Sequence, residues 1–285
     1  MGLEKQQHKW DGCSTEYDTL TQVIVCEPTY MKIEEVINTV QKRYAKDNID
    51  VETALQQHAA FTDVLKGNGV EVITLPAHEE FPEQVFTRDI GFTIGTRVFI
   101  SEMASLIRQG EEKILREWVG SNGIPYQKMT AGSIEGGDVV VDGSKVFVGV
   151  SHRTNHEAID FLEKQLPTNE IIRVPFDASC LHLDCVFTIL SPTHALVYPD
   201  ALSSETLDML GKHYTLMEVK KEEQFAMGTN VLAIGNNKTI SLPQNKAVNE
   251  KLRANHFDVI EIDFSEIIKS GGSFRCCTMP LTRTN

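Results

Sequence analysis

Near the C-terminus, one cysteine lies in a setting that suits nucleophilic chemistry. Cys276 comes directly after Arg275 and shortly after two glycines, Gly271 and Gly272. A neighbouring cation favours the thiolate form of a cysteine, and flexible glycines allow a substrate to approach the sulfur closely. A cysteine in an apolar run is more often a core residue, however, because Cys packs as a small hydrophobe. Cys276 is therefore a candidate nucleophile only if other catalytic groups converge on it.

Reactive side chains also stand at the starts of several predicted strands. These groups are Arg88 and Asp89, the run Glu135-Gly136-Gly137-Asp138, and the run His182-Leu183-Asp184. In an extended strand His182 and Asp184 face the same side and Cys185 faces the other, because side chains alternate. A thiol, an imidazole and an orienting carboxylate are the groups that a cysteine nucleophile needs. The further carboxylates favour a cationic substrate, since acids packed together raise one another's pKa unless a cation neutralises them.

Each of these groups also has an ordinary structural interpretation. Glu135 to Asp138 could be a plain turn, Asp89 a strand-end cap, and His182 a hydrogen-bonded core histidine. A zinc site is a sharper alternative, and its ligands would be Cys180, His182, Cys185 and the pair Cys276-Cys277. Strand alternation turns Cys185 away from the other two, and adjacent strand cysteines face opposite sides. We therefore predict that these residues bind no metal.

The candidate residues are spaced by an internal repeat. Similar units of two strands, a helix and a third strand begin at Asp89, Asp138, Asp184, Asn230 and Cys276. The first spacing is 49 residues and each later one is 46. A period of this length marks a repeat architecture in which equivalent positions face a common place. The spacing therefore predicts that Cys276 meets the other unit starts at one axis.

The fifth unit is cut short by the C-terminus, and the N-terminal part of the chain can complete it. A buried strand at residues 22–26 can supply the second strand, and residues 33–75 can supply the helix and the third strand. Closure of this kind predicts a five-bladed α/β-propeller with its helices outside. Every junction between units is a short turn, so we predict one domain over residues 1–285.

Composition narrows the class of partner. The chain of 285 residues has 27 basic and 40 acidic side chains and a formal charge of −13, which disfavours nucleic acid and anionic membranes. No apolar run approaches the length of a membrane span, and the N-terminus lacks the apolar core of a signal peptide. Six scattered cysteines favour a reducing compartment. We expect a soluble cytoplasmic protein with a small cationic ligand, and a homo-oligomer is possible.

Five motifs together carry a resemblance to a known superfamily. They are Phe86-Thr87-Arg88-Asp89, Glu135-Gly136-Gly137-Asp138, Ser151-His152-Arg153-Thr154-Asn155, Leu181-His182-Leu183-Asp184 and Arg275-Cys276-Cys277-Thr278-Met279-Pro280. From about residue 20 to the end, the chain resembles the guanidine-modifying superfamily of arginine deiminases, amidinotransferases and dimethylarginine dimethylaminohydrolases. Its length and the lack of an inserted helical domain make it most similar to the dimethylarginine dimethylaminohydrolases. The resemblance implies the five-bladed α/β-propeller, or pentein, fold.

The resemblance also implies catalytic roles. Cys276 would be the nucleophile and His182 the general acid and base, while Glu135 would orient the histidine or touch the guanidinium. Asp89 would hold the guanidinium nitrogens. No metal or organic cofactor is needed for this chemistry.

Other residues are expected to bind the rest of the substrate. By the same resemblance Arg108 and Arg153 would clamp an α-carboxylate, and Glu83 and Asp184 are further expected contacts. Asp184 departs from the family pattern, because hydrolases of methylated arginine often have a lysine there. An aspartate at this position resembles arginine deiminases and amidinotransferases instead, so the methylation state of the substrate stays open.

These inferences predict a cysteine-dependent hydrolase that cleaves a guanidinium C–N bond of arginine or methylated arginine. The product would be a ureido compound such as citrulline, with release of an amine or ammonia. Two alternatives share the same thiouronium intermediate, namely an arginine deiminase and an amidinotransferase. A different class is a non-catalytic propeller that binds a cationic ligand, but a binder does not need a nucleophile beside a histidine and a carboxylate.

Overall fold

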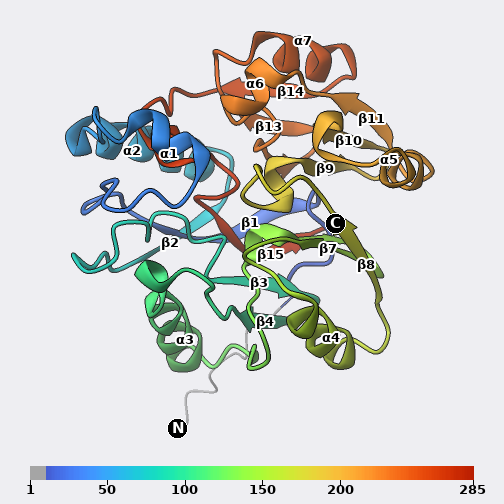
Figure 1. The fold of residues 1–285 in the computed structure, drawn as a ribbon, viewed down its shortest axis with the longest axis horizontal. Coiled ribbons are helices and arrows are strands. Elements are labelled where there is room, and N and C mark those ends of the chain that lie inside the picture. Colours follow the sequence, from blue (N-terminus) through green and yellow to red (C-terminus); the bar gives the residue numbers. More distant parts are fainter. Residues whose placement is uncertain (1–10) are drawn as a thin grey trace, which may run out of the picture.

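The computed structural model describes residues 11–285 and, within them, five three-stranded sheets around a common centre (Figure 1). The first four sheets are β3 (Gly91–Ile94), β4 (Arg97–Ile100) and β5 (Tyr126–Lys128); β6 (Val139–Asp142), β7 (Lys145–Val150) and β8 (Glu170–Pro175); β9 (Phe187–Ser191), β10 (His194–Val197) and β11 (Thr215–Glu218); and β12 (Leu232–Gly235), β13 (Lys238–Ser241) and β14 (Asp258–Glu261). In each sheet the first two strands are antiparallel, and the second and third are parallel. The predicted five-bladed α/β-propeller is confirmed.

The fifth sheet joins the two ends of the chain. β1 (Thr19–Cys26) lies between β15 (Met279–Thr284), to which it is antiparallel, and β2 (Glu71–Leu75), to which it is parallel. The N-terminal segment thus completes the sheet that contains the C-terminus. The single domain over residues 1–285 stays a prediction, and residues 1–10 of it lie outside the described part of the chain.

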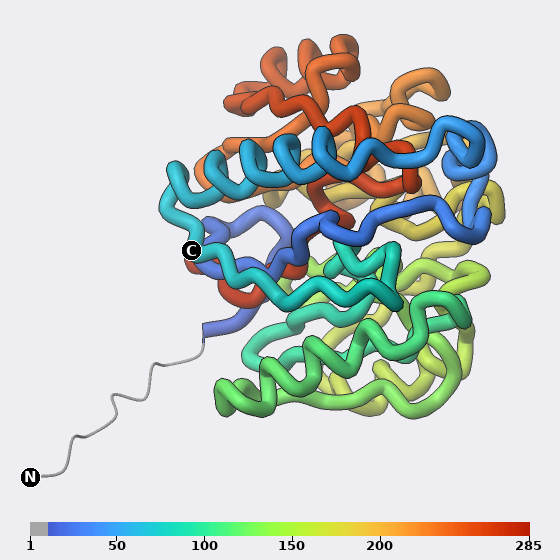
Figure 2. Tube along the Cα trace, turned by 90° about the vertical axis from the view of Figure 1, so that its left-hand side faces the viewer, coloured from blue at the N-terminus to red at the C-terminus, as the bar shows by residue number. Residues whose placement is uncertain are grey.

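Helices connect the parallel strands on the outside of the propeller. The connecting helices are α2 (Val51–Gly67), α3 (Glu111–Ser121), α4 (His156–Gln165), α5 (Ser204–Gly211) and α7 (Lys246–Ala254), while α1 (Thr39–Tyr44) and α6 (Lys221–Phe225) are short. Figures 1 and 2 show the longer helices at the periphery. Three begin at residues whose side chains accept a hydrogen bond from a free backbone N–H, namely Asp50, Asn155 and Ser203. Parallel neighbours require such crossovers, which leave the strand ends free to meet at the centre.

The unit starts differ from the extended strands that the sequence predicts. The 3₁₀ turns are η1 (Leu106–Arg108), η2 (Gly136–Asp138), η3 (Leu183–Cys185), η4 (Pro199–Ala201) and η5 (Ile267–Ser270). η2 and η3 precede β6 and β9, and Cys276 also lies in a turn, since the Cys277 N–H donates to the Ser273 carbonyl at 2.9 Å. Side chains of successive residues in a turn do not alternate between two faces. The expectation that Cys185 points away from Asp184 is therefore wrong, as its contacts show below.

Within residues 11–285, no helix combines the length and the apolar character that crossing a bilayer requires. All six cysteines lie in this part of the chain and are free thiols. The cytoplasmic location stays a prediction.

A buried carboxylate ties the N-terminal segment to the centre of the propeller. Glu16 is 4% exposed, and its two oxygens accept hydrogen bonds from Arg88 at 2.9 Å and from Arg275 at 2.6 Å. Arg88 also donates to the backbone carbonyls of Gly136 and Val139, so it faces the structural core and not a ligand. Although burial opposes ionisation, the charges of Arg275 and Arg88 hold the pKa of Glu16 below its usual range.

Replacing Glu16 with glutamine should destabilise the fold by about 3–5 kcal/mol, because two buried guanidinium groups lose their counter-charge. A carboxyl with a depressed pKa contributes stability above its unfolded pKa of about 4.5, so the difference between wild type and Glu16→Gln should shrink as the pH falls below that value. Urea unfolding at pH 7 and pH 3.5 measures both effects. The control is Glu34→Gln, which breaks an exposed pair with Lys32 and should change stability by no more than about 1 kcal/mol.

Candidate functional site

A small enclosed cavity lies where the unit starts converge. Its free volume of about 10 Å³ is on the order of that needed for one water molecule. Its lining is Ile37, Asn38, Glu83, Phe86, Asp89, Arg108, Leu181, His182, Ser270, Gly271, Gly272 and Cys276. Ile37, Asn38, Leu181 and Gly271 also line an outer groove of about 1010 Å³. A substrate that enters from this groove must displace part of that shared wall.

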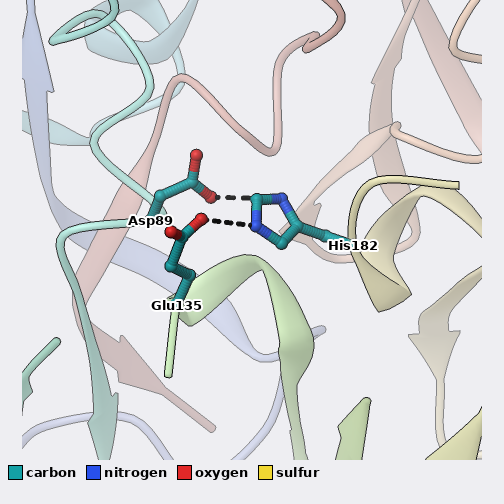
Figure 3. Close-up of side chains that lie close together, drawn as sticks. All are labelled: Asp89, Glu135 and His182. Atoms are coloured by element: carbon teal, nitrogen blue, oxygen red, sulfur yellow. Dashed lines mark hydrogen bonds and ion pairs between the residues drawn. The ribbon is translucent and has the colours of Figure 1, made fainter. Parts of the chain in front are cut away.

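The histidine of the cavity is held between two carboxylates (Figure 3). One ring nitrogen of His182, Nε2, lies 2.8 Å from Glu135 Oε2, and the other, Nδ1, lies 3.6 Å from Asp89 Oδ1. Burial lowers the pKa of the imidazole, but the charge of Asp89 and the hydrogen bond to Glu135 outweigh it and raise the pKa to about 10. A Cβ on Gly137 would lie 2.8 Å from the ring, so glycine is needed there. His182 is therefore a protonated group that can act as an acid.

Glu135 is completely buried behind the histidine. Burial raises the pKa of its carboxyl, but the hydrogen bond and charge of His182, with Arg153, lower it overall. Both oxygens of Glu135 lie 3.3 Å from Arg153 Nη1, and Oε1 accepts a hydrogen bond from the Ala104 N–H at 3.1 Å. These partners fix the carboxylate and, through it, the ring of His182. Arg153 itself lines the outer groove.

Asp89 combines a paired and an unpaired oxygen. Oδ2 accepts a hydrogen bond from Arg108 Nη1 at 2.5 Å. Within residues 11–285, the buried Oδ1 has no hydrogen-bond partner, and the nearby His182 Nδ1 is 3.6 Å away. A buried acceptor without a donor is costly unless a ligand or water supplies one. Asp89 Oδ1 is thus placed to accept an N–H from a bound cation.

Arg108 and Glu83 also line the cavity. Arg108 is 1% exposed and pairs with Glu111 at 2.8 Å as well as with Asp89. Glu83 accepts hydrogen bonds from Gln41 Nε2 at 2.7 Å and from Ser270 Oγ at 3.0 Å. Burial raises the pKa of Glu83 to about 7, although the charge of Arg108 opposes the shift. Glu83 is therefore an acid that can gain or lose a proton near neutral pH.

Cys276 also lines the cavity. Its Sγ lies 3.7 Å from Asp184 Oδ2 and 3.9 Å from Oδ1, and its N–H donates to Asn230 Oδ1 at 3.2 Å. Asp184 is in turn 3.5 Å from Arg275 Nε. Burial raises the pKa of Asp184 despite the nearby charges of Arg275 and His182. The thiol therefore has a carboxylate beside it that can accept a proton.

Most of the site residues expected from the sequence meet at this cavity, but some line it and others only contact the residues that line it. Cys276, His182, Asp89, Glu83 and Arg108 line it. Glu135 and Arg153 stand behind or beside His182. Asp184 was expected to face the guanidinium, yet it lies beside the Cys276 sulfur. Within residues 11–285, Asp184 is not among the residues that line the cavity.

The geometry also bears on the metal alternative. In the described part of the chain, the cluster with ligand atoms within 4.8 Å of one another is Asp89, Glu135 and His182. It does not include the cysteines that the zinc alternative proposed. His182 has a hydrogen bond to Glu135 and an ion pair with Asp89 at 3.6 Å, so ion pairing already accounts for this cluster.

Some contributors were missed from the sequence. Glu111 stands three residues after Arg108, and this helical spacing was a usable local signal. Gln41 and Ser270 support Glu83 from positions 42 and 187 residues away, and these pairings depend on closure of the propeller, so spacing along the chain gives no sign of them. Asn230 was expected near Cys276 from the 46-residue period, and its amide oxygen accepts the Cys276 N–H.

Comparison with known proteins agrees with this architecture. The family model described as N,N dimethylarginine dimethylhydrolase, eukaryotic, matches residues 27–283. The chain is 51% identical over 283 residues to the uncharacterized protein YkgA of Bacillus subtilis, with 99% of each chain covered. It is 25% identical to the N(G),N(G)-dimethylarginine dimethylaminohydrolase of Mycobacterium tuberculosis, over 89% of this chain and 83% of that protein.

Solved structures show the same fold. The N-terminal domain of ArgZ, a cyanobacterial arginine dihydrolase solved with its product, superposes with a TM-score of 0.85 at 23% identity. The match covers 93% of this chain and 98% of that one, and at this sequence identity it shows only that the two chains share a fold. The family-model match over residues 27–283 and the similarity to a dimethylarginine dimethylaminohydrolase place the chain among guanidino-modifying hydrolases and transferases. The chain belongs to the N,N-dimethylarginine dimethylhydrolase family.

Proposed function

We propose that this protein hydrolyses a guanidinium C–N bond of arginine or a methylated arginine through a covalent Cys276 intermediate. The observation that carries the proposal is the unpaired Asp89 Oδ1 in a cavity shared with the Cys276 thiol and the protonated His182. A guanidinium supplies the missing N–H donor and a carbon for the thiolate to attack. Asp89 and Glu83 line the cavity and offer carboxylate oxygens to a cationic substrate.

The proposed reaction has two halves. Asp184 accepts the thiol proton, and the Cys276 sulfur forms a bond to the guanidinium carbon while Asp89 holds the nitrogens. His182 gives its proton to the leaving amine or ammonia as the C–N bond breaks. A thiouronium remains on Cys276. His182, now neutral, takes a proton from water, which attacks the same carbon and releases the ureido product and the thiolate.

The positively charged rim fits the other end of an amino-acid substrate. Arg153 lines the outer groove together with Lys42, Arg43 and Lys221. These side chains can hold an α-carboxylate, as Arg108 is proposed to do from inside the cavity. Arg108 is buried and paired with Asp89 and Glu111, whereas Arg153, which also pairs with Glu135, lines the outer groove, so Arg153 is the better placed of the two arginines.

A substrate screen tests this function. Arginine, monomethylarginine, asymmetric dimethylarginine, agmatine and guanidinoacetate should be incubated with the protein, and both the ureido product and the released amine measured. Hydrolysis yields the two in equal amounts. An amidinotransferase would form ureido product only slowly and would accelerate when a second amine is added. Binding without turnover of any compound would identify a non-catalytic ligand-binding propeller and contradict the proposal.

Asp184→Asn tests whether this carboxylate determines the preference between arginine and dimethylarginine. Because Asp184 lies beside the Cys276 sulfur and not in the cavity lining, the change should lower kcat/KM for arginine and asymmetric dimethylarginine by a similar factor. Their ratio should change less than about threefold. If Asp184 instead accepted an N–H from the substituted nitrogen, the ratio would shift roughly ten- to a hundredfold towards dimethylarginine. Steady-state kinetics of both substrates with both proteins decide between the two.

A further inference from the structure

A second thiol lies next to the proposed nucleophile. Cys185 Sγ is 3.6 Å from Asp184 Oδ1, and Cys276 Sγ is 3.9 Å from the same oxygen. Both cysteines are 3% exposed. Cys185 belongs to the 3₁₀ turn η3, which directs its side chain towards Asp184 and Cys276. The proposed hydrolysis gives Cys185 no task.

The backbones that carry the two thiols are tied together. Asn230 Oδ1 accepts from the Cys276 N–H at 3.2 Å, and Asn230 Nδ2 donates to the Asp184 carbonyl at 3.4 Å. Thr229 Oγ1 donates to the Cys185 carbonyl at 2.6 Å. One amide therefore bridges the two segments. Disulfides require neighbouring backbones, and rotation of two short side chains can then bring the sulfurs together.

The two buried thiols line adjoining spaces. Cys276 lines the enclosed cavity, and Cys185 lines the outer groove of about 1010 Å³. A hydroperoxide, which is far smaller than an arginine, can reach the cavity by the route a substrate uses. The hydrogen bond with Cys276, burial and the charge of Asp184 together raise the pKa of Cys185. Cys185 is therefore suited to react second, after the sulfur of Cys276 has been oxidised.

We propose that Cys185 and Cys276 form an oxidation site in which a hydroperoxide converts the pair into a reversible disulfide. The Cys276 thiolate attacks the hydroperoxide, an S–O bond forms as the O–O bond breaks, and the alcohol or water leaves. Cys276 is now a sulfenic acid, oxidised by two electrons. Cys185 attacks its sulfur, an S–S bond replaces the S–O bond, and the hydroxide leaves as water with the Cys185 proton.

The disulfide would switch off turnover and protect the nucleophile. With its sulfur bonded to Cys185, Cys276 cannot attack a guanidinium. A dithiol can restore both thiols, whereas a sulfenic acid without a neighbouring thiol continues to the sulfinic acid, which dithiols do not reduce. Cys185 would thus decide whether peroxide damage is reversible.

The first measurement does not need activity, so it stands apart from the proposed function. The whole protein is treated with a small excess of hydrogen peroxide, and its peptides are mapped by mass spectrometry without reduction. We expect a peptide pair linked through Cys185 and Cys276, with four of the six thiols still free. Linkage of Cys276 to Cys180 or Cys277, or no linkage, would overturn the proposal.

The second measurement uses matched variants. Wild type should lose at least nine-tenths of its activity on oxidation and regain most of it with dithiothreitol. Cys185→Ser and Cys185→Ala should regain less than about one-tenth and should carry sulfinic acid on Cys276. Cys180→Ser is the control, since Cys180 also lines the groove but contacts Gln224, and it should behave as wild type. If the Cys185 variants have no activity, the mass of the Cys276 peptide still reports its oxidation state. Full recovery in the Cys185 variants would refute the role of this thiol.

Discussion

Replacing Cys276 with serine is expected to lower kcat by at least about 10³-fold. A serine hydroxyl at this position keeps the shape of the site but is a far weaker nucleophile, because the neighbouring carboxylate and arginine do not ionise an alcohol. The contacts of Cys276 with Asp184 and the Asn230 amide are compatible with serine, so the fold should survive. Single-turnover kinetics with intact-protein mass spectrometry should show no covalent adduct in this variant.

The matched control is Cys277→Ser. Cys277 is fully buried in the hydrophobic cluster that contains Val25 and Phe274. In the described part of the chain, Cys276 lines the cavity and Cys277 does not. The variant should therefore keep most of its kcat, even if burying a hydroxyl lowers its stability. If Cys277→Ser lost the adduct and Cys276→Ser kept it, Cys277 would be the nucleophile. That result would contradict the 46-residue spacing that leads to Cys276.

The propeller could be predicted because its signal is distributed along the whole chain. Each unit repeats the same order of strands and helix, and the spacing led from Asp89 to Cys276 without any spatial information. Completion of the last blade followed from the same count, since β15 lacked partners that residues 22–26 and 71–75 could supply. A repeat constrains the fold strongly because every unit must bury its apolar faces against its neighbours.

The orientation of individual side chains could not be predicted in the same way. The period-two rule failed at Cys185 because the chain turns before β9, and the turn is stabilised by contacts from distant residues. Asp138 illustrates such a contact, since its carboxylate accepts the Leu183 N–H at 2.8 Å across 45 residues. Likewise, Arg88 was grouped with Asp89 by sequence, but its partner is Glu16, which no motif indicated. Local rules place a residue on an element, whereas tertiary hydrogen bonds decide where it points.

Replacing His182 with alanine is expected to lower kcat by about 10²–10⁴-fold, because one imidazole serves as the acid in the first half-reaction and as the base in the second. Formation of the adduct and its hydrolysis should both slow. Rapid quenching followed by intact mass measurement separates the two steps. His213→Ala is the control, since His213 is exposed and outside the cavity, and it should leave both rates unchanged. If His182→Ala formed the adduct at the normal rate and only its hydrolysis were slow, His182 would act only as the base of the second half-reaction.

The pH dependence gives the same residue a signature that a structural role would not produce. His182 has its pKa raised to about 10 by Asp89 and Glu135, against the effect of burial, so the free enzyme holds the acid form throughout neutral pH. The rate of adduct formation should therefore depend on His182 being charged and should fall as the pH rises through about 10. In Glu135→Gln the hydrogen bond to a charged partner is lost, so the fall should move to lower pH. An unchanged midpoint in that variant would show that another group controls the proton transfer to the leaving amine.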